Sequence, residues 1–220
     1  MKKSKTSKVR PTHLRAKRKR QNIPARYHHG NLRAALIEAG LKALEVNDRR
    51  ELSLRELARR VGVSANASYR HFANKEALLS ALAAEGFRRL QAAYTKASAQ
   101  QSRPDAGFRA AGRVYVQFAI DNPALFRLMF EHFTFIQKDP ELLEASMACF
   151  QWMLNFLAGM IGLTPNDPRV LLNALVGWST VHGLSHLVLS GQLESIGGIT
   201  DQLIDAVVNT DVPLFMMLNK

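Results

Sequence analysis

The sequence predicts an all-α protein in which an N-terminal three-helix unit with a helix-turn-helix is joined by a long helix to a C-terminal helical bundle. Two observations support this class. Apolar residues recur at helical spacing along most of the chain, and no stretch alternates apolar and polar residues as a half-buried strand would. With 47% hydrophobic and 22% charged residues, the 220-residue chain can bury a sizeable core.

The first two helices are predicted from their apolar stripes and their end signals. Asn31 can cap an amphipathic helix that continues to about residue 46. Ser53 and Glu56 form the S-x-x-E pattern of a capping box, which opens a short second helix. Gly62 ends that helix, because glycine tolerates the left-handed conformation that follows a helix C-terminus.

The later helices are separated by proline, glycine and asparagine residues. Ser64 is predicted to cap a short third helix that runs to about Phe72. Asn74 is predicted to cap a long fourth helix that runs to about Gln101. The remaining helices are expected near residues 105–121, 123–132, 139–162, 168–190 and 199–217.

The charge is divided unevenly along the chain. Residues 1–30 contain eleven Lys or Arg and no Asp or Glu, residues 31–96 carry a net charge of +5, and residues 97–220 carry −4. A basic front and a mildly acidic back predict that only the front is drawn to a polyanion. Residues 1–27 have few large apolar side chains, so we expect them to form a basic, flexible arm.

The composition indicates a cytoplasmic protein without a membrane segment. Cys149 is the single cysteine, so one chain cannot form a disulfide. No apolar stretch is close to the length of a membrane-spanning helix, which needs about 18 residues. The basic N-terminus is also not followed by the apolar segment of a signal peptide. We therefore expect the protein to work in the reducing cytoplasm.

Residues 53–72, SLRELARRVGVSANASYRHF, have the pattern of a helix-turn-helix. Glycine after the first helix permits the sharp turn, and Phe72 returns the chain to the core. The apolar side chains of the first helix, which should face inward, are Leu54, Leu57, Ala58 and Val61.

The second helix of this pair should stand out from the unit, and such a helix fits the DNA major groove. Asn66 is the candidate for reading a base edge, because its amide offers both a donor and an acceptor. Tyr69, His71 and Lys75 suit phosphate oxygens, which position a protein without reading sequence. The amides at the two helix starts can add phosphate contacts. The full set of candidates is Ser53, Ser64, Ala65, Asn66, Ser68, Tyr69, Arg70, His71 and Lys75.

The basic arm offers a second route to DNA, because its positive charges can neutralise phosphates at any sequence. The candidates for contact with a flanking minor groove are Arg18, Lys19, Arg20 and Arg26. The alternative interpretation of the arm is a solvated tail that aids solubility.

The run from Leu54 to Leu79, L-R-E-L-A-R-R-V-G-V-S-x-x-x-x-Y-R-H-F-x-x-K-E-A-L-L, resembles the DNA-binding region of TetR-family transcriptional regulators. Residues 27–33, YHHGNLR, and residues 177–183, GWSTVHG, resemble one branch of that family, which has a Trp-His-Gly motif in its C-terminal domain. The branch usually has proline or an apolar residue where this chain has Ser68, which leaves the base preference open.

The resemblance implies a three-helix DNA reader, a linking fourth helix, and a C-terminal helical domain that binds a ligand and dimerises. It implies domains at residues 28–80 and 81–220, after the arm. Family members are mostly repressors that a small molecule releases. We therefore expect a repressor that binds a pseudo-palindromic operator as a homodimer and is released by a small apolar effector.

The C-terminal half is rich in Phe, Leu and Met, most of which we assign to a core. By analogy with the family, a cavity among these helices would bind the effector, with Trp152, Phe156, Trp178 and His182 as its lining. His182 and His186 share a helix face at a spacing that suits a metal, but no acidic residue lies between them. A packed, hydrogen-bonded histidine pair is the preferred interpretation, with no metal and no cofactor.

The last two predicted helices have apolar residues on more than one face, which indicates a partner. Pairing with a second copy would give a four-helix bundle about a two-fold axis. The residues concerned are Leu171, Leu172, Leu175, Val176, Val181, Leu184, Leu187, Val188, Leu203, Ile204, Val207 and Val208.

Two other classes of function are weighed against a regulator. The sequence contains no nucleophile elbow, phosphate loop or paired-carboxylate arrangement, so we expect no enzyme activity. The stronger rival is a non-specific or architectural DNA-binding protein that acts through the basic arm.

Overall fold

The computed structural model describes residues 31–46, 51–131, 139–198 and 200–210, and every regular element in these ranges is a helix. The all-α class predicted from the sequence is confirmed. The helices are α1 (Leu32–Leu44), α2 (Leu54–Val61), α3 (Ala65–Tyr69), α4 (Lys75–Ala99), α5 (Pro104–Asp121), α6 (Pro123–Glu131), α8 (Pro140–Ile161), α9 (Pro168–Leu189), the 3-10 helix η2 (Glu194–Ile196) and α10 (Asp201–Asn209).

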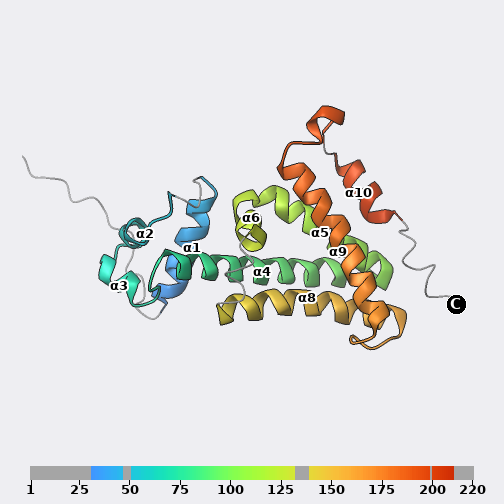
Figure 1. The fold of residues 1–220 in the computed structure, drawn as a ribbon, viewed down its shortest axis with the longest axis horizontal. Coiled ribbons are helices and arrows are strands. Elements are labelled where there is room, and N and C mark those ends of the chain that lie inside the picture. The colour runs from blue at the N-terminus through green and yellow to red at the C-terminus, as the bar shows by residue number, and fades with distance from the viewer. Residues whose placement is uncertain (1–30, 47–50, 132–138, 199, 211–220) are drawn as a thin grey trace, which may run out of the picture.

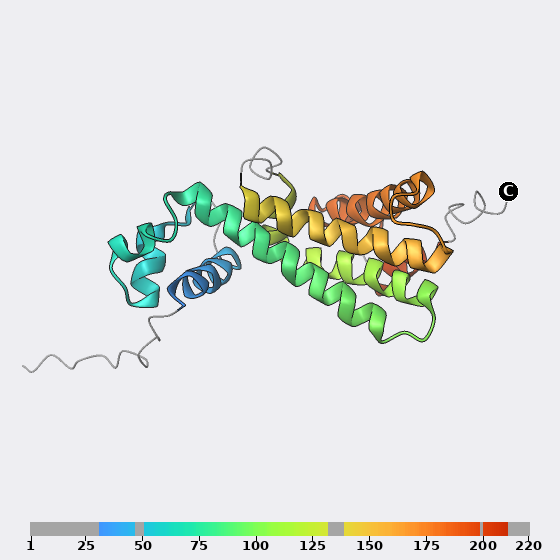
Figure 2. The same ribbon diagram turned by 90° about the horizontal axis from the view of Figure 1, so that it is seen from below.

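The helices form a small head and a larger body. Figure 1 shows the head, made of α1, α2 and α3, at one end of the molecule, and α4 running from the head along the body. Helix α8 lies beside α4 in both views, and α5, α6, α9 and α10 complete the body (Figures 1 and 2). None of the described helices is long and apolar enough to cross a membrane.

Helix α4 supplies buried side chains to both the head and the body. Leu78 and Leu82 are fully buried near its start, where α4 packs against α1 and the two leucines join the apolar core of the head. Leu90 and Tyr94, three to four turns farther along, pack in the body against α5 and α8. A single cluster of buried apolar residues therefore extends from the head into the body through α4.

Three of the predicted end signals are confirmed. The Ser64 hydroxyl oxygen accepts a hydrogen bond from the Ala67 amide at 3.3 Å, and the Asn74 side-chain oxygen accepts one from the Ala77 amide at 2.8 Å. Gly62 has a φ of 83°, so a residue with a Cβ would be strained at this turn. The turn between α2 and α3 thus has the geometry that the sequence predicts.

The predicted side-chain caps at Asn31 and Ser53 are wrong, because neither side chain makes a cap hydrogen bond. The capping box also needs the Glu56 carboxylate to reach back to residue 53. Instead, this carboxylate accepts hydrogen bonds from Arg59 and Arg60, which lie one turn later on α2. The Glu56 carboxylate is thus engaged by two guanidinium groups and does not complete the box.

The final helix is shorter than predicted. Helix α10 ends at Asn209, and the ψ of 119° at Thr210 lies outside the helical region. The predicted span of 199–217 contained Pro213, which would remove an interior hydrogen bond of a helix. Residues 211–217 lie outside the described residues.

Helix α10 packs on the body of its own chain. Ile204 is buried against Val116 of α5 and Leu184 of α9. Arg113 of α5 donates a hydrogen bond to the Asp201 carboxylate at 2.9 Å and also pairs with Asp205. The apolar face of α10, which the sequence analysis assigned to a second copy, is therefore largely covered within one chain.

Candidate nucleic-acid interface and cavity

The helix-turn-helix is held by a buried face on α2. Leu54, Leu57 and Ala58 are buried as predicted, and Val61 is partly buried. Phe72, just after α3, is 2% exposed and joins the same core. These contacts anchor α3 against α1 and α2 and leave its opposite face at the surface of the head.

Most of the predicted DNA-contacting residues are exposed on the surface of the head. Ala65 and Lys75 are partly buried. Those that are exposed are Ser53, Ser64, Asn66, Tyr69, Arg70 and His71. The head therefore presents an amide, a phenol, an imidazole and a guanidinium within six residues of chain, 66–71.

Ser68 is buried, although the sequence predicted it among the exposed candidates. Its side chain is 0% exposed, and its hydroxyl donates a hydrogen bond to the Ala65 carbonyl at 2.7 Å. The residue faces the interior because α3 is only five residues long and packs one side against the rest of the head. Ser68 is thus a packing position, which agrees with the apolar residue that the resembling branch has there.

The outer surface of α2 combines positive charge with an acidic residue. The side-chain hydrogen bonds from Arg59 and Arg60 lower the pKa of Glu56 to about 2, so its carboxylate is ionised. The carboxylate partly neutralises the two guanidinium groups and orients them along the helix. The arm candidates Arg18, Lys19, Arg20 and Arg26 lie outside the described residues.

The body contains a mainly apolar cavity of about 620 Å³ lined by residues of α4, α5, α6, α8, α9 and α10. This volume lies within the range of about 300–1,000 Å³ that is usual for small-molecule sites. Three of the four predicted lining residues, Trp152, Trp178 and His182, do line it. Phe156 does not: its ring stacks on Trp152 at 5.1 Å and on Phe108 at 6.3 Å, behind the lining.

A hydrogen-bonded group of aromatic side chains forms part of the cavity wall. The indole nitrogen of Trp178 donates to the Tyr115 hydroxyl at 3.2 Å, and that hydroxyl lies 2.6 Å from Nδ1 of His182. Burial and the nearby charge of His186 lower the pKa of His182 to about 4, so the imidazole is neutral at pH 7. Sequence reasoning missed Tyr115, because its partners lie 63 and 67 residues away on α9.

The two histidines of α9 pack against each other. Their ring centroids lie 4.5 Å apart with the planes at 69°. Among the described residues, no three His, Cys, Asp or Glu side chains gather in a group that would hold a metal ion. Cys149 also lines the cavity, and burial raises the pKa of its thiol to about 12, so the thiol stays protonated.

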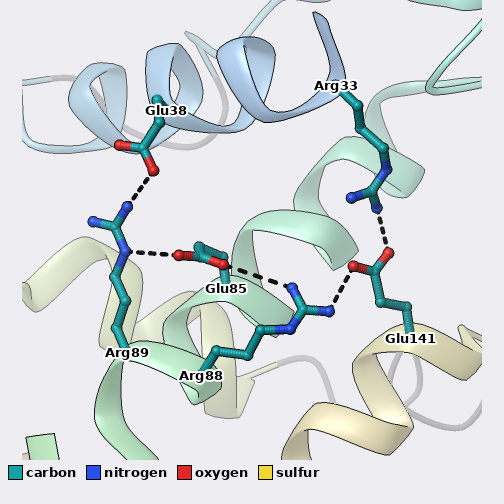
Figure 3. A network of polar contacts seen from close by, with 6 residues as sticks. All are labelled: Arg33, Glu38, Glu85, Arg88, Arg89 and Glu141. Carbon is teal, nitrogen blue, oxygen red and sulfur yellow. Dashed lines mark hydrogen bonds and ion pairs between the residues drawn. The ribbon is translucent and has the colours of Figure 1, made fainter. Parts of the chain in front are cut away.

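A network of ion pairs joins the head to the body on the surface of α4 (Figure 3). Arg33 of α1 pairs with Glu141 in the first turn of α8, and Arg88 of α4 donates to the same carboxylate at 2.7 Å. Arg89 of α4 pairs with Glu38 of α1, which makes a second bridge to the head. The sequence did not predict this network, because Arg33 and Glu141 are 108 residues apart.

Arg33 also contacts the helix-turn-helix. Its guanidinium carbon lies 5.4 Å from the centre of the Phe72 ring, a cation–π geometry. Leu143, two residues after Glu141, lines the cavity. One arginine therefore contacts both Phe72 at the end of the helix-turn-helix and Glu141 on α8, the helix that forms a wall of the cavity.

Comparison with known families decides what this arrangement is. The family model described as bacterial regulatory proteins, tetR family, matches residues 36–82, and the one described as tetracyclin repressor-like, C-terminal domain, matches residues 108–210. The chain belongs to the TetR family. The C-terminal match includes the Trp178–Gly183 segment, in agreement with the predicted branch.

Solved structures agree with this assignment. A protein with unknown function from Rhodococcus sp. RHA1 is 34% identical, with a TM-score of 0.69, over 87% of this chain and 96% of that chain. A tetR-family transcriptional regulator from Streptomyces coelicolor is 17% identical, with a TM-score of 0.63, over 84% of this chain and 81% of that one. No curated protein matches the chain.

By family and fold, this TetR-family chain is a DNA-binding transcriptional regulator. The helix-turn-helix of α2 and α3 lies within the matched N-terminal region, and the cavity is built largely from the matched C-terminal region. The family and fold are those of regulators, which are generally not enzymes.

The ion network makes a prediction about stability and pH. Burial raises the pKa of Glu141, but the hydrogen bonds and charges of Arg88 and Arg33 outweigh burial and hold the pKa below its usual value of 4.5. Glu141→Gln should lower the free energy of unfolding at pH 7 by roughly 0.5–1 kcal/mol, a modest figure because the pair is partly solvated. A carboxyl group whose pKa is lowered in the folded state stabilises the fold when the pH lies above the group's usual pKa. This stabilisation is lost as the pH falls through the lowered pKa.

The difference in unfolding free energy between wild type and Glu141→Gln should therefore narrow below about pH 4.5 in urea titrations. Glu144→Gln is the matched control, because Glu144 is exposed on the same helix and makes no ion pair within the described part of the chain. An equal loss of unfolding free energy in both variants would contradict a role for the network. So would a difference between wild type and Glu141→Gln that stays constant with pH.

Proposed function

We propose that this regulator is a repressor that binds a pseudo-palindromic operator as a homodimer and is released by a small apolar ligand. The observation that carries the proposal is the connection, through α4, of an exposed polar reading helix and an apolar cavity of about 620 Å³. In this proposal α3, the reading helix, binds DNA in the cytoplasm. A ligand in the cavity changes the orientation of the head relative to the body.

In the proposed complex, α3 enters the major groove. Asn66, exposed in the first turn of α3, reads a base edge. Tyr69, which is 44% exposed at the other end of the helix, contacts phosphate together with Arg70 and His71. The short reading helix offers few base contacts, so dimer spacing and DNA shape supply the rest of the specificity.

Exposed apolar side chains on α8 and α9 support a homodimer. On α9, Leu172 and Leu175 are 51% and 42% exposed, and on α8 Met147 is 61% exposed. Water-exposed leucine and methionine side chains on neighbouring helices indicate a surface that a partner covers. The proposed interface therefore uses α8 and α9, whereas the sequence analysis assigned it to the last two helices.

The proposed coupling runs through α8 and α4. Helix α8 forms one wall of the cavity with Leu143, Ser146 and Met147, and its first turn holds Glu141 against Arg33 of the head. A ligand that displaces this end of α8 would alter the Arg33–Glu141 pair and, through Phe72, the support of the reading helix. The coupling requires only that the ligand binds one arrangement more tightly than the other.

Two single substitutions on α3 test the reading role. After an operator is selected from random DNA, Asn66→Ala should relax the preference at one or two base positions, at a cost of about 1–3 kcal/mol for the preferred base. Tyr69→Ala should weaken binding to all sequences alike, because a phosphate contact carries no base information. Binding titrations against operator variants distinguish the two effects.

Ser68→Ala is the matched control for these titrations. It removes a hydroxyl from the same helix, but this hydroxyl is fully buried, so the base preference should not change. Equal and sequence-blind losses from Asn66→Ala and Tyr69→Ala would refute the base-reading role of Asn66.

The eleven positive charges of residues 1–30 favour a second candidate, an architectural DNA-binding protein that acts through the arm. Gel-shift competition at two salt concentrations, with and without residues 1–25, separates the candidates. A regulator should lose affinity and salt dependence but keep a strong preference for its operator after truncation. Loss of nearly all binding on truncation would favour the architectural protein instead.

A further inference from the structure

We propose that the ligand of the cavity is an uncharged, largely apolar molecule with one hydrogen-bond acceptor, which binds to the Nε2–H of His182. This inference rests on the proposed function, since it takes the cavity as the effector site. It adds the chemical class of the effector and the side chain that recognises it.

The hydrogen-bond chain on the cavity wall favours one tautomer of His182. The Trp178 indole can only donate, so the Tyr115 oxygen accepts from it at 3.2 Å. The Tyr115 proton then has Nδ1 of His182 as its acceptor, at 2.6 Å. A neutral imidazole that accepts at Nδ1 carries its proton on Nε2.

The Nε2–H edge remains available to a ligand. Within the described residues, Tyr115 is the one hydrogen-bond partner of His182, and no fully buried side-chain nitrogen or oxygen atom lacks a partner. The Nε2 atom is therefore not fully buried. Since His182 lines the cavity, a ligand in the cavity could reach this atom. A carbonyl, ether or similar oxygen would satisfy this donor.

The surroundings of His182 disfavour a charged ligand. The imidazole is neutral, because burial and His186 lower the pKa of His182 to about 4. The charged lining residues Asp105 and Arg109 pair with each other at 3.1 Å, so the lining carries no net charge from them. A carboxylate would have to lose its hydration without gaining an unpaired cation in return.

The rings around His182 favour a flat, apolar body. Phe130 lies 4.8 Å and Trp178 lies 5.7 Å from the imidazole, measured between ring centroids. Both rings line the cavity, and an aromatic or other flat ligand would bury its faces against them. The acceptor on such a ligand would need to lie at its edge to reach Nε2.

The chain contains its own reporter for the test. Its two tryptophans, Trp152 and Trp178, both line the cavity, so intrinsic fluorescence reports occupation. Three probes share one ring system: 2-ethylnaphthalene has no acceptor, 2-acetonaphthone has a ketone acceptor, and 2-naphthoate has a carboxylate. Titrations use the full chain without DNA, so failure of this inference is distinguishable from failure of operator binding.

In wild type, both neutral probes should quench the fluorescence, and 2-naphthoate should bind at least about tenfold more weakly than 2-acetonaphthone. His182→Phe keeps a ring but removes the donor. It should weaken the binding of 2-acetonaphthone by about three- to tenfold and change the affinity for 2-ethylnaphthalene by less than about twofold. Thr180→Val is the control, because Thr180 lines the cavity but its hydroxyl donates to the Val176 carbonyl at 2.9 Å.

Tyr115→Phe is a second variant, which keeps the packing and removes the proton that holds the His182 tautomer. It should weaken the binding of 2-acetonaphthone and leave the binding of 2-ethylnaphthalene unchanged, as His182→Phe should. The inference is overturned if 2-naphthoate binds most tightly, if none of the probes binds to wild type, or if the variants weaken both neutral probes equally.

Discussion

Helix α4 packs simultaneously into the head and into the body, and the other features of the molecule depend on this shared packing. Its first turns bury Leu78 and Leu82 in the apolar core that α1 shares, and its later turns place Leu90 and Tyr94 beside the cavity. The close contact with α1 favours glycine at position 40, because a Cβ there would lie 2.9 Å from the buried Leu82 side chain, which would have to shift. The head is therefore part of the same apolar core as the cavity wall.

The ion network at the same junction has a different physical character. The Arg33 and Glu141 side chains are 39% and 33% exposed, and partly solvated pairs contribute little to stability. In the proposed coupling, a weak contact between α8 and the head suits a switch, because a ligand would need little differential binding energy to break it. The shared core keeps the head attached, and in the proposed coupling the Arg33 contacts would set its orientation.

The helices and the family were predictable from the sequence, whereas the site was predictable only in part. Spacing and end signals identified each α-helix of the described residues but not the short η2. Glu56 was assigned to a capping box although Arg59 and Arg60 stood at pairing distance along the same helix. Ser68 was misplaced because the orientation of a five-residue helix depends on its neighbours. The bond between Tyr115 and His182 joins different helices, and a local pattern carries no information about such contacts.

Hydrogen exchange measured in increasing urea tests the shared core most directly. If α4 holds the head and the body in one cooperative unit, the slowest amides of α1 and of α8 should lose protection at the same urea concentration. Both sets rely on the buried face of α4, so its opening exposes them together. Loss of protection throughout α1 at a concentration where α5, α8 and α9 remain fully protected would contradict this account.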